Sequence, residues 1–444
     1  MNKLPDMMGS ARNGSLHDPL THIKPTGALV LKGGRVIDPK NKVDAVKDIS
    51  IRDGMISKVA DSIIPEKGDR VIDVNGLLVF PGLIDMHLHV GDLFEISTDP
   101  IYTAVADGVT MGLSPGAGNT LMAPSLLGAE VDRGLPMHVG VYLGAACVLA
   151  PRASVEEKIA FFRGELPWEV GAVSLSRNPI TNTTGMLCVG IKDHMGHYIL
   201  SDESLDAIFE ISSKANLVFM SHTQDPAHAE RLVGLSKGRP LHLAHATAAG
   251  CGTHADAVES MQRVVDLVKK PGVTAEFVST QLRPGKGSRE GLLLPEKAQE
   301  VAYEALANGL VKVMVSDGQN DATMKGFGDT RDNVPAILEL VEMNVLNLPE
   351  AVALMTTNPA ALFAERTGQA WWVDKVGHLG KGAYANVTVV DPRDKLATIT
   401  IVNGVIAGFE DRAVRGASGA GGWVSKWGIL SRTGVGDLAV FSYA

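Results

Sequence analysis

The chain has 444 residues, a formal net charge of −9 and 45% hydrophobic residues, enough to fill a sizeable core. An acidic balance without a basic run excludes the electrostatic footprint of a nucleic-acid-binding protein, so we expect a small-molecule partner and no nucleic acid. No stretch approaches the roughly 18 apolar residues of a membrane span, and we expect no membrane partner.

Two further features concern the cellular compartment. Residues 1–26 form a polar N-terminal tail without the apolar core of a secretion signal. Three widely spaced cysteines predict buried thiols in a reducing compartment: Cys147, Cys188 and Cys251. Together these features predict a cytoplasmic protein.

Residues 27–78 show strand-like alternation with tight-turn signals, among them Asp53-Gly54. The same signature returns near the other end, where Asn403-Gly404 separates two β-prone runs. Neither half alone is a convincing domain. We therefore expect residues 27–78 and 367–414 to form one small β-sandwich domain, with a larger domain, residues 79–366, inserted between them.

A hydrophobic strand starting near Pro81 ends with two histidines, His87 and His89. Side chains two apart on a strand point to the same face, so both imidazoles can reach one metal ion. A His-x-His pair alone is weak evidence, since histidine has many roles. More candidate ligands follow it, however.

Each further candidate lies near the end of an apolar, β-prone run, and helix-like stretches such as 205–215 and 255–269 separate these runs. The candidates are Lys192, His222, His245 and Asp317. Strands alternating with helices predict a parallel α/β array. If this array closes into a barrel, the carboxyl ends of its strands bring these residues together.

The sequence leaves three structural points open. Residues 170–176 also read as a strand and compete with the run ending at Lys192 for the fourth barrel position. His242, three residues before His245, is expected on the opposite face of its strand, packing outward. The C-terminal tail, residues 415–444, either straps over its own barrel or docks on a neighbouring subunit.

From about residue 27 to 414 the chain resembles the amidohydrolase superfamily, metal hydrolases built on a distorted TIM (β/α)8 barrel. Supports besides the histidine motif are Gly33-Gly34-Arg35-Val36-Ile37-Asp38, Thr357-Asn358-Pro359-Ala360 and Gly382-Ala383-Tyr384-Ala385-Asn386-Val387. Similarity is greatest to the hydantoinase, dihydropyrimidinase and dihydroorotase branch. There a strand-four lysine, matched by Lys192, is carboxylated by carbon dioxide and bridges two metals.

The resemblance implies a ligand for each metal position. His87, His89 and Asp317 would hold one divalent ion, His222 and His245 the other, and carboxylated Lys192 would bridge them. Neutral imidazoles and anionic oxygens suit Zn²⁺, although Mn²⁺ or Fe²⁺ would also fit.

The resemblance also implies a mechanism. A metal-bridging hydroxide would attack the carbonyl, and Asp317 would take its proton and pass it to the leaving nitrogen. Hydantoinases usually place an oxyanion-donating tyrosine five residues after the bridging lysine. Here His197 occupies that position and Tyr198 follows, so both are candidate catalytic residues.

Substrate contacts are less defined. Dihydroorotases usually carry an arginine two residues after the second histidine, whereas this chain has Gly91, which argues against a dihydroorotase. Candidate substrate-binding residues are Ser279, Arg283 and Asn333, for which ordinary surface roles are equal alternatives.

The sequence thus predicts a binuclear metal-dependent hydrolase of a cyclic amide, imide or ureide, assembled as a homodimer or homotetramer. One alternative is hydrolysis of acyclic N-acyl amides, as in D-aminoacylases or isoaspartyl dipeptidases. Another is a non-catalytic dihydropyrimidinase-like scaffold, against which the retention of every candidate ligand counts.

Overall fold

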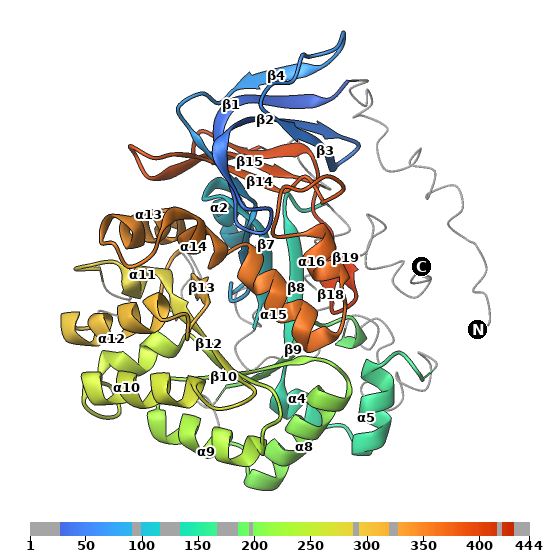
Figure 1. Cartoon of the computed structure of the whole chain (residues 1–444). Helices are drawn as coiled ribbons and strands as arrows, with labels where there is room; N and C mark the ends of the chain where they lie inside the picture. Colours follow the sequence, from blue (N-terminus) through green and yellow to red (C-terminus); the bar gives the residue numbers. More distant parts are fainter. Residues whose placement is uncertain are drawn as a thin grey trace.

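The computed structural model describes residues 27–90, 99–115, 134–166, 185–194, 199–286, 293–318, 327–414 and 420–429. A β-rich domain built from both ends of the chain lies beside an α/β barrel (Figure 1). Strands β14 and β15, from late in the chain, lie with β1 and β2 in the β-rich domain.

The β-rich domain is formed around one nine-stranded sheet in the order β17-β16-β15-β14-β5-β1-β2-β3, with β4 beside β1. Its strands are β1 (Leu29–Asp38), β2 (Val43–Arg52), β3 (Met55–Ala60), β4 (Arg70–Asp73), β5 (Leu78–Pro81), β14 (Val387–Asp391), β15 (Leu396–Val402), β16 (Val405–Phe409) and β17 (Arg412–Ala413). The antiparallel pair β5–β14 joins the two chain ends. Because β5 extends to Pro81 within this sheet, the barrel begins a few residues after Val79.

Both predicted hairpins are present. Asp53 and Gly54 join β2 to β3 with φ angles of 53° and 78°, and Asn403 and Gly404 join β15 to β16 with 47° and 77°. Two consecutive left-handed residues match the twist of a two-residue hairpin. The turns also touch, since a Cβ added to Gly54 would lie 3.1 Å from the Asn403 carbonyl oxygen. This contact ties the N-terminal hairpin to the C-terminal one.

The barrel strands run parallel in sequence order from β6 to β13. They are β6 (Leu83–Asp85), β7 (Val109–Ser114), β8 (His138–Gly144), β9 (Gly190–Asp193), β10 (Val218–His222), β11 (Leu241–Ala244), β12 (Val273–Val278) and β13 (Val313–Val315). A bridge between Leu88 and Gly318 closes the ring, and both Asp85 carboxylate oxygens accept from Ser316 N at 3.2 Å. The predicted fold class, an α/β barrel with a small β-rich domain, is confirmed.

Helices cover the outside of the barrel (Figure 1). Their bounds are α2 (Asp99–Ala106), α4 (Ala145–Leu149), α5 (Val155–Phe162), α8 (Asp202–Lys214), α9 (Pro226–Ser236), α10 (Ala257–Val268), α11 (Ser279–Leu282), α12 (Glu296–Ala307), α13 (Asn333–Glu342), α14 (Leu348–Ala353), α15 (Thr357–Thr367) and α16 (Trp371–Lys375), with 3-10 turns η1 (Ala246–Cys251) and η2 (Thr330–Asp332). Helix α10 illustrates their origin. Asp256 caps its first turn, and Met261, Val264 and Val268 bury one face.

Register places a row of residues inside the barrel. Lys192 lies opposite Met220, Met220 opposite His242, and His242 opposite Thr274. Neighbours in register point to the same side of a parallel sheet, and Met220 belongs to the buried apolar cluster that fills the interior. The row therefore lines the interior beneath the carboxyl ends of the strands.

Residues 420–429 strap over the barrel to which they belong. Strand β18 (Trp423–Ser425) pairs in parallel with the start of β8, and β19 (Gly428–Ile429) turns back on it. Trp423 Nε1 donates to Leu187 O at 2.9 Å, and Lys426 Nζ donates to Ala215 O at 2.6 Å. These bonds lie at the amino-terminal end of β8, opposite the end that carries the candidate ligands. Within the described ranges no helix is both long and apolar enough to cross a membrane.

Candidate metal centre

The predicted ligands gather where the barrel strands end. His87 Nε2 lies 2.9 Å from Asp317 Oδ1, and His89 Nε2 lies 3.1 Å from the same oxygen. The His245 ring centroid is 5.1 Å from that of His87 and 4.4 Å from that of His222. Five residues at or just after the ends of β6, β10, β11 and β13 thus meet at one edge of the barrel.

An unusual backbone conformation directs two of these side chains toward the cluster. His245 comes directly after β11 and Asp317 two residues after β13, and their φ angles are 39° and 49°. Non-glycine residues rarely occupy this left-handed region, and such strain concentrates at functional sites. The change of direction carries both side chains off the strand and into the cluster.

Three residues meet the requirements of one metal site. Donor atoms of His87, His245 and Asp317 all lie within 4.8 Å of one another, and all three residues are buried. The buried His245 Nδ1 has no hydrogen-bond partner among the described residues. A buried imidazole nitrogen without a partner costs free energy that coordination would recover. The donor set therefore fits a divalent metal ion.

Protonation states also suit coordination. Desolvation, followed by the charge of Lys192, lowers the pKa of His222 to about 3. Desolvation and the neighbouring His222 hold the pKa of His245 well below its usual range. Burial alone would raise the pKa of Asp317, but His87 and His245 hold it well below its usual value. At neutral pH His222 and His245 are thus neutral imidazoles and Asp317 is a carboxylate, the forms that bind metals.

Lys192 lies on a barrel strand. Strand β9 pairs with β8 on one side and β10 on the other, and the Lys192 side chain is 1% exposed. Its partner in register, Met220, lies two residues before His222 on β10, and its charge is among the causes that lower the pKa of His222 and His245. The run ending at Lys192 thus forms the fourth barrel strand. Residues 170–176, the alternative for this position, lie outside the described ranges.

Glu276 is a functional candidate that the sequence analysis missed. It is fully buried on β12, and its Oε1 accepts from His87 Nδ1 and, at 3.1 Å, from the His245 backbone N–H. Its Oε2 accepts from His242 Nε2 at 3.0 Å. The sequence did contain a signal, because Glu276 lies among apolar residues in the run 273–278. Burying a carboxylate costs free energy unless donors pair with it, so such a residue indicates buried partners.

The expectation that His242 packs outward is wrong. His242 is buried, in register with Lys192 through Met220, and bonded to Glu276 inside the barrel. The parity argument failed because β11 ends at Ala244 and His245 is already left-handed, so the two histidines do not share one strand.

The predicted substrate contacts have partners within the chain. Ser279 Oγ donates to Asn333 Oδ1 at 2.8 Å, and both residues are buried. Arg283 pairs with Asp332, and its other guanidinium nitrogens donate to Glu339 at 2.9 and 2.8 Å. This double ion pair ties α11 to α13 and engages the arginine head group, a structural role. His197, Tyr198 and Gly91 lie outside the described ranges.

Phe327, which the sequence analysis did not single out, covers part of the cluster. Its ring centroid is 5.0 Å from that of His245 and 6.3 Å from that of His222. Its backbone N–H donates to Asp317 Oδ2 at 2.8 Å. It therefore combines an apolar wall with a bond that orients the carboxylate.

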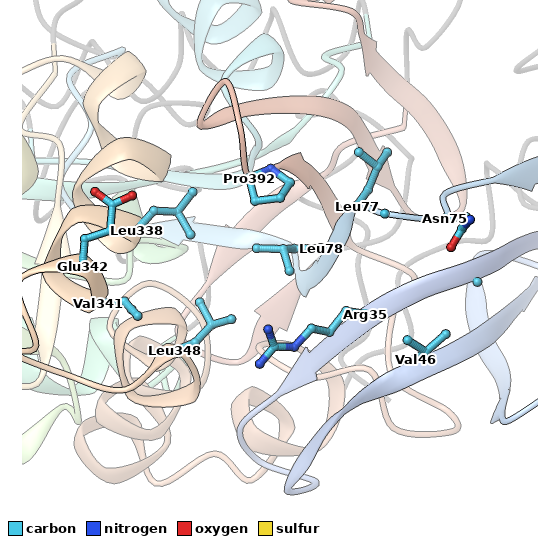
Figure 2. A pocket seen from close by; sticks show the side chains of 12 residues that line it. Arg35, Val46, Asn75, Leu77, Leu78, Leu338, Val341, Glu342, Leu348 and Pro392 are labelled. Carbon is cyan, nitrogen blue, oxygen red and sulfur yellow. The ribbon is translucent and has the colours of Figure 1, made fainter.

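A groove of about 490 Å³ lies elsewhere, between the β-rich sheet and helices α13 and α14 (Figure 2). Its walls include Leu78, Leu338, Val341 and Leu348, with Arg35 and Glu342 among its polar groups. None of the predicted ligands lines it. The candidate chemistry is therefore separate from this groove.

The model of the amidohydrolase family matches residues 78–413, about three quarters of the chain. The chain belongs to the amidohydrolase family. A dihydroorotase of Geobacter sp. (strain M21) is 25% identical over 403 residues, covering 82% of this amidohydrolase and 89% of the relative.

Solved structures share the fold of this amidohydrolase. An L-hydantoinase (dihydropyrimidinase) from Arthrobacter aurescens matches with a TM-score of 0.63 at 17% identity, covering 90% of this chain and 100% of the other. A beta-aspartyl dipeptidase from Fervidobacterium islandicum AW-1 matches with a TM-score of 0.61 at 16% identity, covering 88% and 99%. The one barrel architecture is therefore common to proteins named for different amide substrates.

Proposed function

We propose that this amidohydrolase cleaves the amide bond of a cyclic amide, imide or ureide in a metal-dependent reaction. The observation that carries the proposal is the convergence of His87, His245 and Asp317 at the carboxyl end of the barrel, within 4.8 Å of one another. Family membership and the cyclic substrates named by the dihydroorotase and hydantoinase relatives support it.

The proposed centre is binuclear. His87, His89 and Asp317 would hold one ion, probed first as Zn²⁺ with Mn²⁺ and Fe²⁺ as alternatives, and His222 and His245 would hold the second. Lys192 would bridge them as a carbamate, because its neutral amine can bond to the carbon of carbon dioxide and release a proton from nitrogen, which leaves an anionic oxygen ligand. When bound, such ions lower the pKa of water from ~15.7 towards 7 and polarise a carbonyl.

Asp317 is the proposed proton carrier. Its carboxylate is ionised and faces His87 and His89, so it can accept a proton from the attacking water and return it to the leaving nitrogen. His197 or Tyr198 is the proposed donor to the carbonyl oxygen. Comparing His197→Ala with Tyr198→Phe assigns this role to the residue whose variant loses turnover; loss in neither leaves polarisation to the metals alone.

Substrate recognition is proposed for the rim of the same barrel edge. Ser279 and Asn333 are the proposed contacts, from the start of α11 and the start of α13; both are buried, and Ser279 Oγ donates to Asn333 Oδ1 at 2.8 Å. Gly91 stands where dihydroorotases usually have arginine, so the proposed substrate lacks the carboxylate of dihydroorotate. We leave Arg283 out of the substrate site, because its guanidinium is held by Asp332 and Glu339.

The test combines metal analysis with a hydrolysis screen. Protein from metal-replete growth is expected to hold close to two transition-metal ions per chain and to open a hydantoin, dihydropyrimidine or cyclic imide. Activity confined to N-acyl amino acids or isoaspartyl dipeptides would replace the proposal with the acyclic alternative. Bound metal without hydrolysis of any of these compounds would contradict both.

We also propose that the protein is cytoplasmic and that it assembles as a homodimer or homotetramer. The cytoplasm is supported by Cys147, Cys188 and Cys251, which are all thiols rather than disulfides, as is typical of a reducing compartment; Cys188 is buried and the other two are partly exposed. Light scattering on the purified chain tests the assembly, and a single-chain mass would contradict it.

A further inference from the structure

Glu276 connects two members of the metal cluster from inside the barrel. Through Oε1 it accepts from the His87 ring at Nδ1 and from the His245 backbone N–H, the latter at 3.1 Å. His245 is the residue whose left-handed backbone, with φ 39°, turns its side chain into the cluster. A single carboxylate oxygen therefore contacts both the ring of one ligand and the strained turn of another.

Hydrogen-bond direction fixes the tautomer of His87. An ionised carboxylate only accepts, so the proton of His87 lies on Nδ1. Nε2 faces Asp317 Oδ1 at 2.9 Å, on the side of the cluster, so it is the nitrogen that would offer its lone pair to a metal ion bound there. The tautomer set by Glu276 is the one that offers Nε2 to a metal ion.

A buried chain of donors holds Glu276 in turn. His242 Nε2 donates to Glu276 Oε2 at 3.0 Å, and His242 Nδ1 lies 2.9 Å from Thr274 Oγ1. Arg366 Nη2 lies 3.4 Å from that hydroxyl and donates to it. Since His242 donates from Nε2, its Nδ1 accepts from Thr274, and the chain runs in one direction from Arg366 to Glu276.

We propose that Glu276 is a positioning residue that sets the His87 tautomer and the His245 turn for metal binding, and that His242 holds Glu276 for this task. The inference rests on the proposed metal function of the cluster. Such carboxylate partners of ligating histidines typically change metal affinity 10- to 100-fold when altered. Glu276 contacts the His87 ring, the His242 ring and the His245 backbone, so we assign it a positioning role and not a catalytic one.

The test measures metal affinity and a proton signal, without substrate. Zn²⁺ competition against a chromophoric chelator is expected to show Glu276→Gln binding about 10- to 100-fold more weakly than the unsubstituted chain. In ¹⁵N-histidine-labelled, metal-free protein, the far-downfield Nδ1–H signal assigned to His87 should shift upfield, because a neutral amide is a weaker acceptor than a carboxylate.

Asp48→Asn is the matched control. Asp48 is also a buried carboxylate with several donors, from Lys32, Gly33 and Ile63, but it lies in the β-rich sheet. This variant should leave Zn²⁺ affinity and the His87 signal unchanged, even if its thermal stability falls as far as that of Glu276→Gln.

Several outcomes would overturn the proposal. They are Zn²⁺ affinity of Glu276→Gln within twofold of the unsubstituted chain, an equal loss in Asp48→Asn, or no Zn²⁺ binding by the unsubstituted chain. If Glu276→Gln does not fold, His242→Phe decides: a loss of affinity supports the proposal and unchanged affinity overturns it. Because hydrolysis is not measured, a chain that binds Zn²⁺ but opens no cyclic amide would contradict only the proposed function.

Discussion

At the scale of single residues, the candidate centre is made by side chains that leave their strands at unusual angles. His245 and Asp317 both have positive φ, and both bring their donor atoms within 4.8 Å of His87. The strain is of order 1–3 kcal/mol per residue and persists where surrounding bonds hold the turn. Here the bond from the His245 N–H to Glu276 is one such restraint.

Asp317→Asn should lower the turnover number by about 10²- to 10⁴-fold, because the amide keeps the shape and one acceptor oxygen but cannot carry a proton. Circular dichroism should show an unchanged fold, since the Phe327 N–H can still donate to the amide oxygen. Steady-state kinetics on the best substrate measures the effect. A loss of less than about tenfold would place the base elsewhere.

Lys192→Ala should remove the bridge between the two proposed ions, leaving less than two metals per chain and no measurable turnover. Short carboxylic acids such as acetate should restore part of the activity, because their oxygens can occupy the space left by the carbamate. Lys158→Ala is a control, as Lys158 is a buried lysine that instead donates to Leu149 O at 3.1 Å. Full activity of Lys192→Ala would exclude it as a ligand.

At the scale of elements, the structure depends on contacts between segments distant in sequence. Strand β18 extends the barrel sheet along β8, and η2 meets the end of α2 through a hydrogen bond from Thr330 to Asp107. Both contacts join segments separated by more than 200 residues. A substitution at either contact is therefore expected to change the free energy of unfolding of the chain.

Trp423→Ala should destabilise the chain by about 3–5 kcal/mol, because a fully buried indole and its bond to Leu187 O are lost and a cavity remains. Chemical denaturation monitored by circular dichroism measures the change. Trp427→Ala should cost clearly less, since this ring is only partly buried beside Lys426. Equal small losses in both variants would show that the strap contributes little.

Asp107→Asn should stabilise the chain at pH 8 and not at pH 4. Burial raises the pKa of Asp107 from 3.8 to about 7, so between these values the folded state holds a proton that the unfolded state has released. Stability from this group therefore falls as pH rises towards 7, by up to about 4 kcal/mol for the full change in pKa and by less because the group is partly exposed. Urea unfolding at both pH values measures it. A variant less stable at pH 8 would contradict the shift.

At the scale of the whole molecule, the two chain ends build one sheet and the barrel lies between them in sequence. The β5–β14 pair and the contact between the Gly54 and Gly404 turns join both ends into one unit. Barrel closure at Leu88 and Gly318 lies next to the proposed ligands His89 and Asp317. Metal binding is therefore expected to stabilise the barrel as a whole.

Removing metal with a strong chelator should lower Tm, and adding Zn²⁺ back should restore it, because an ion that binds only the folded chain stabilises by RT ln(1 + [L]/Kd). At a free concentration 100 times Kd the gain is about 2.7 kcal/mol. Differential scanning fluorimetry measures it, with Mg²⁺ as the control ion. A Tm that does not depend on Zn²⁺ would argue against a centre in the folded chain.

The sequence alone determined the features that are local. Period-two alternation, Asp-Gly and Asn-Gly turns and strand-end polar residues predicted both hairpins and a parallel α/β array, since these patterns follow from backbone geometry within a few residues. Closure of the array into a barrel, and with it the meeting of His87, His245 and Asp317, was implied by the resemblance to the amidohydrolase superfamily. Tertiary structure alone decided the inward position of His242, its bond to Glu276 and the ion pairs that engage Arg283. Those depend on where strands end, on left-handed φ at His245 and on partners 30 or more residues away, none of which is encoded by local spacing.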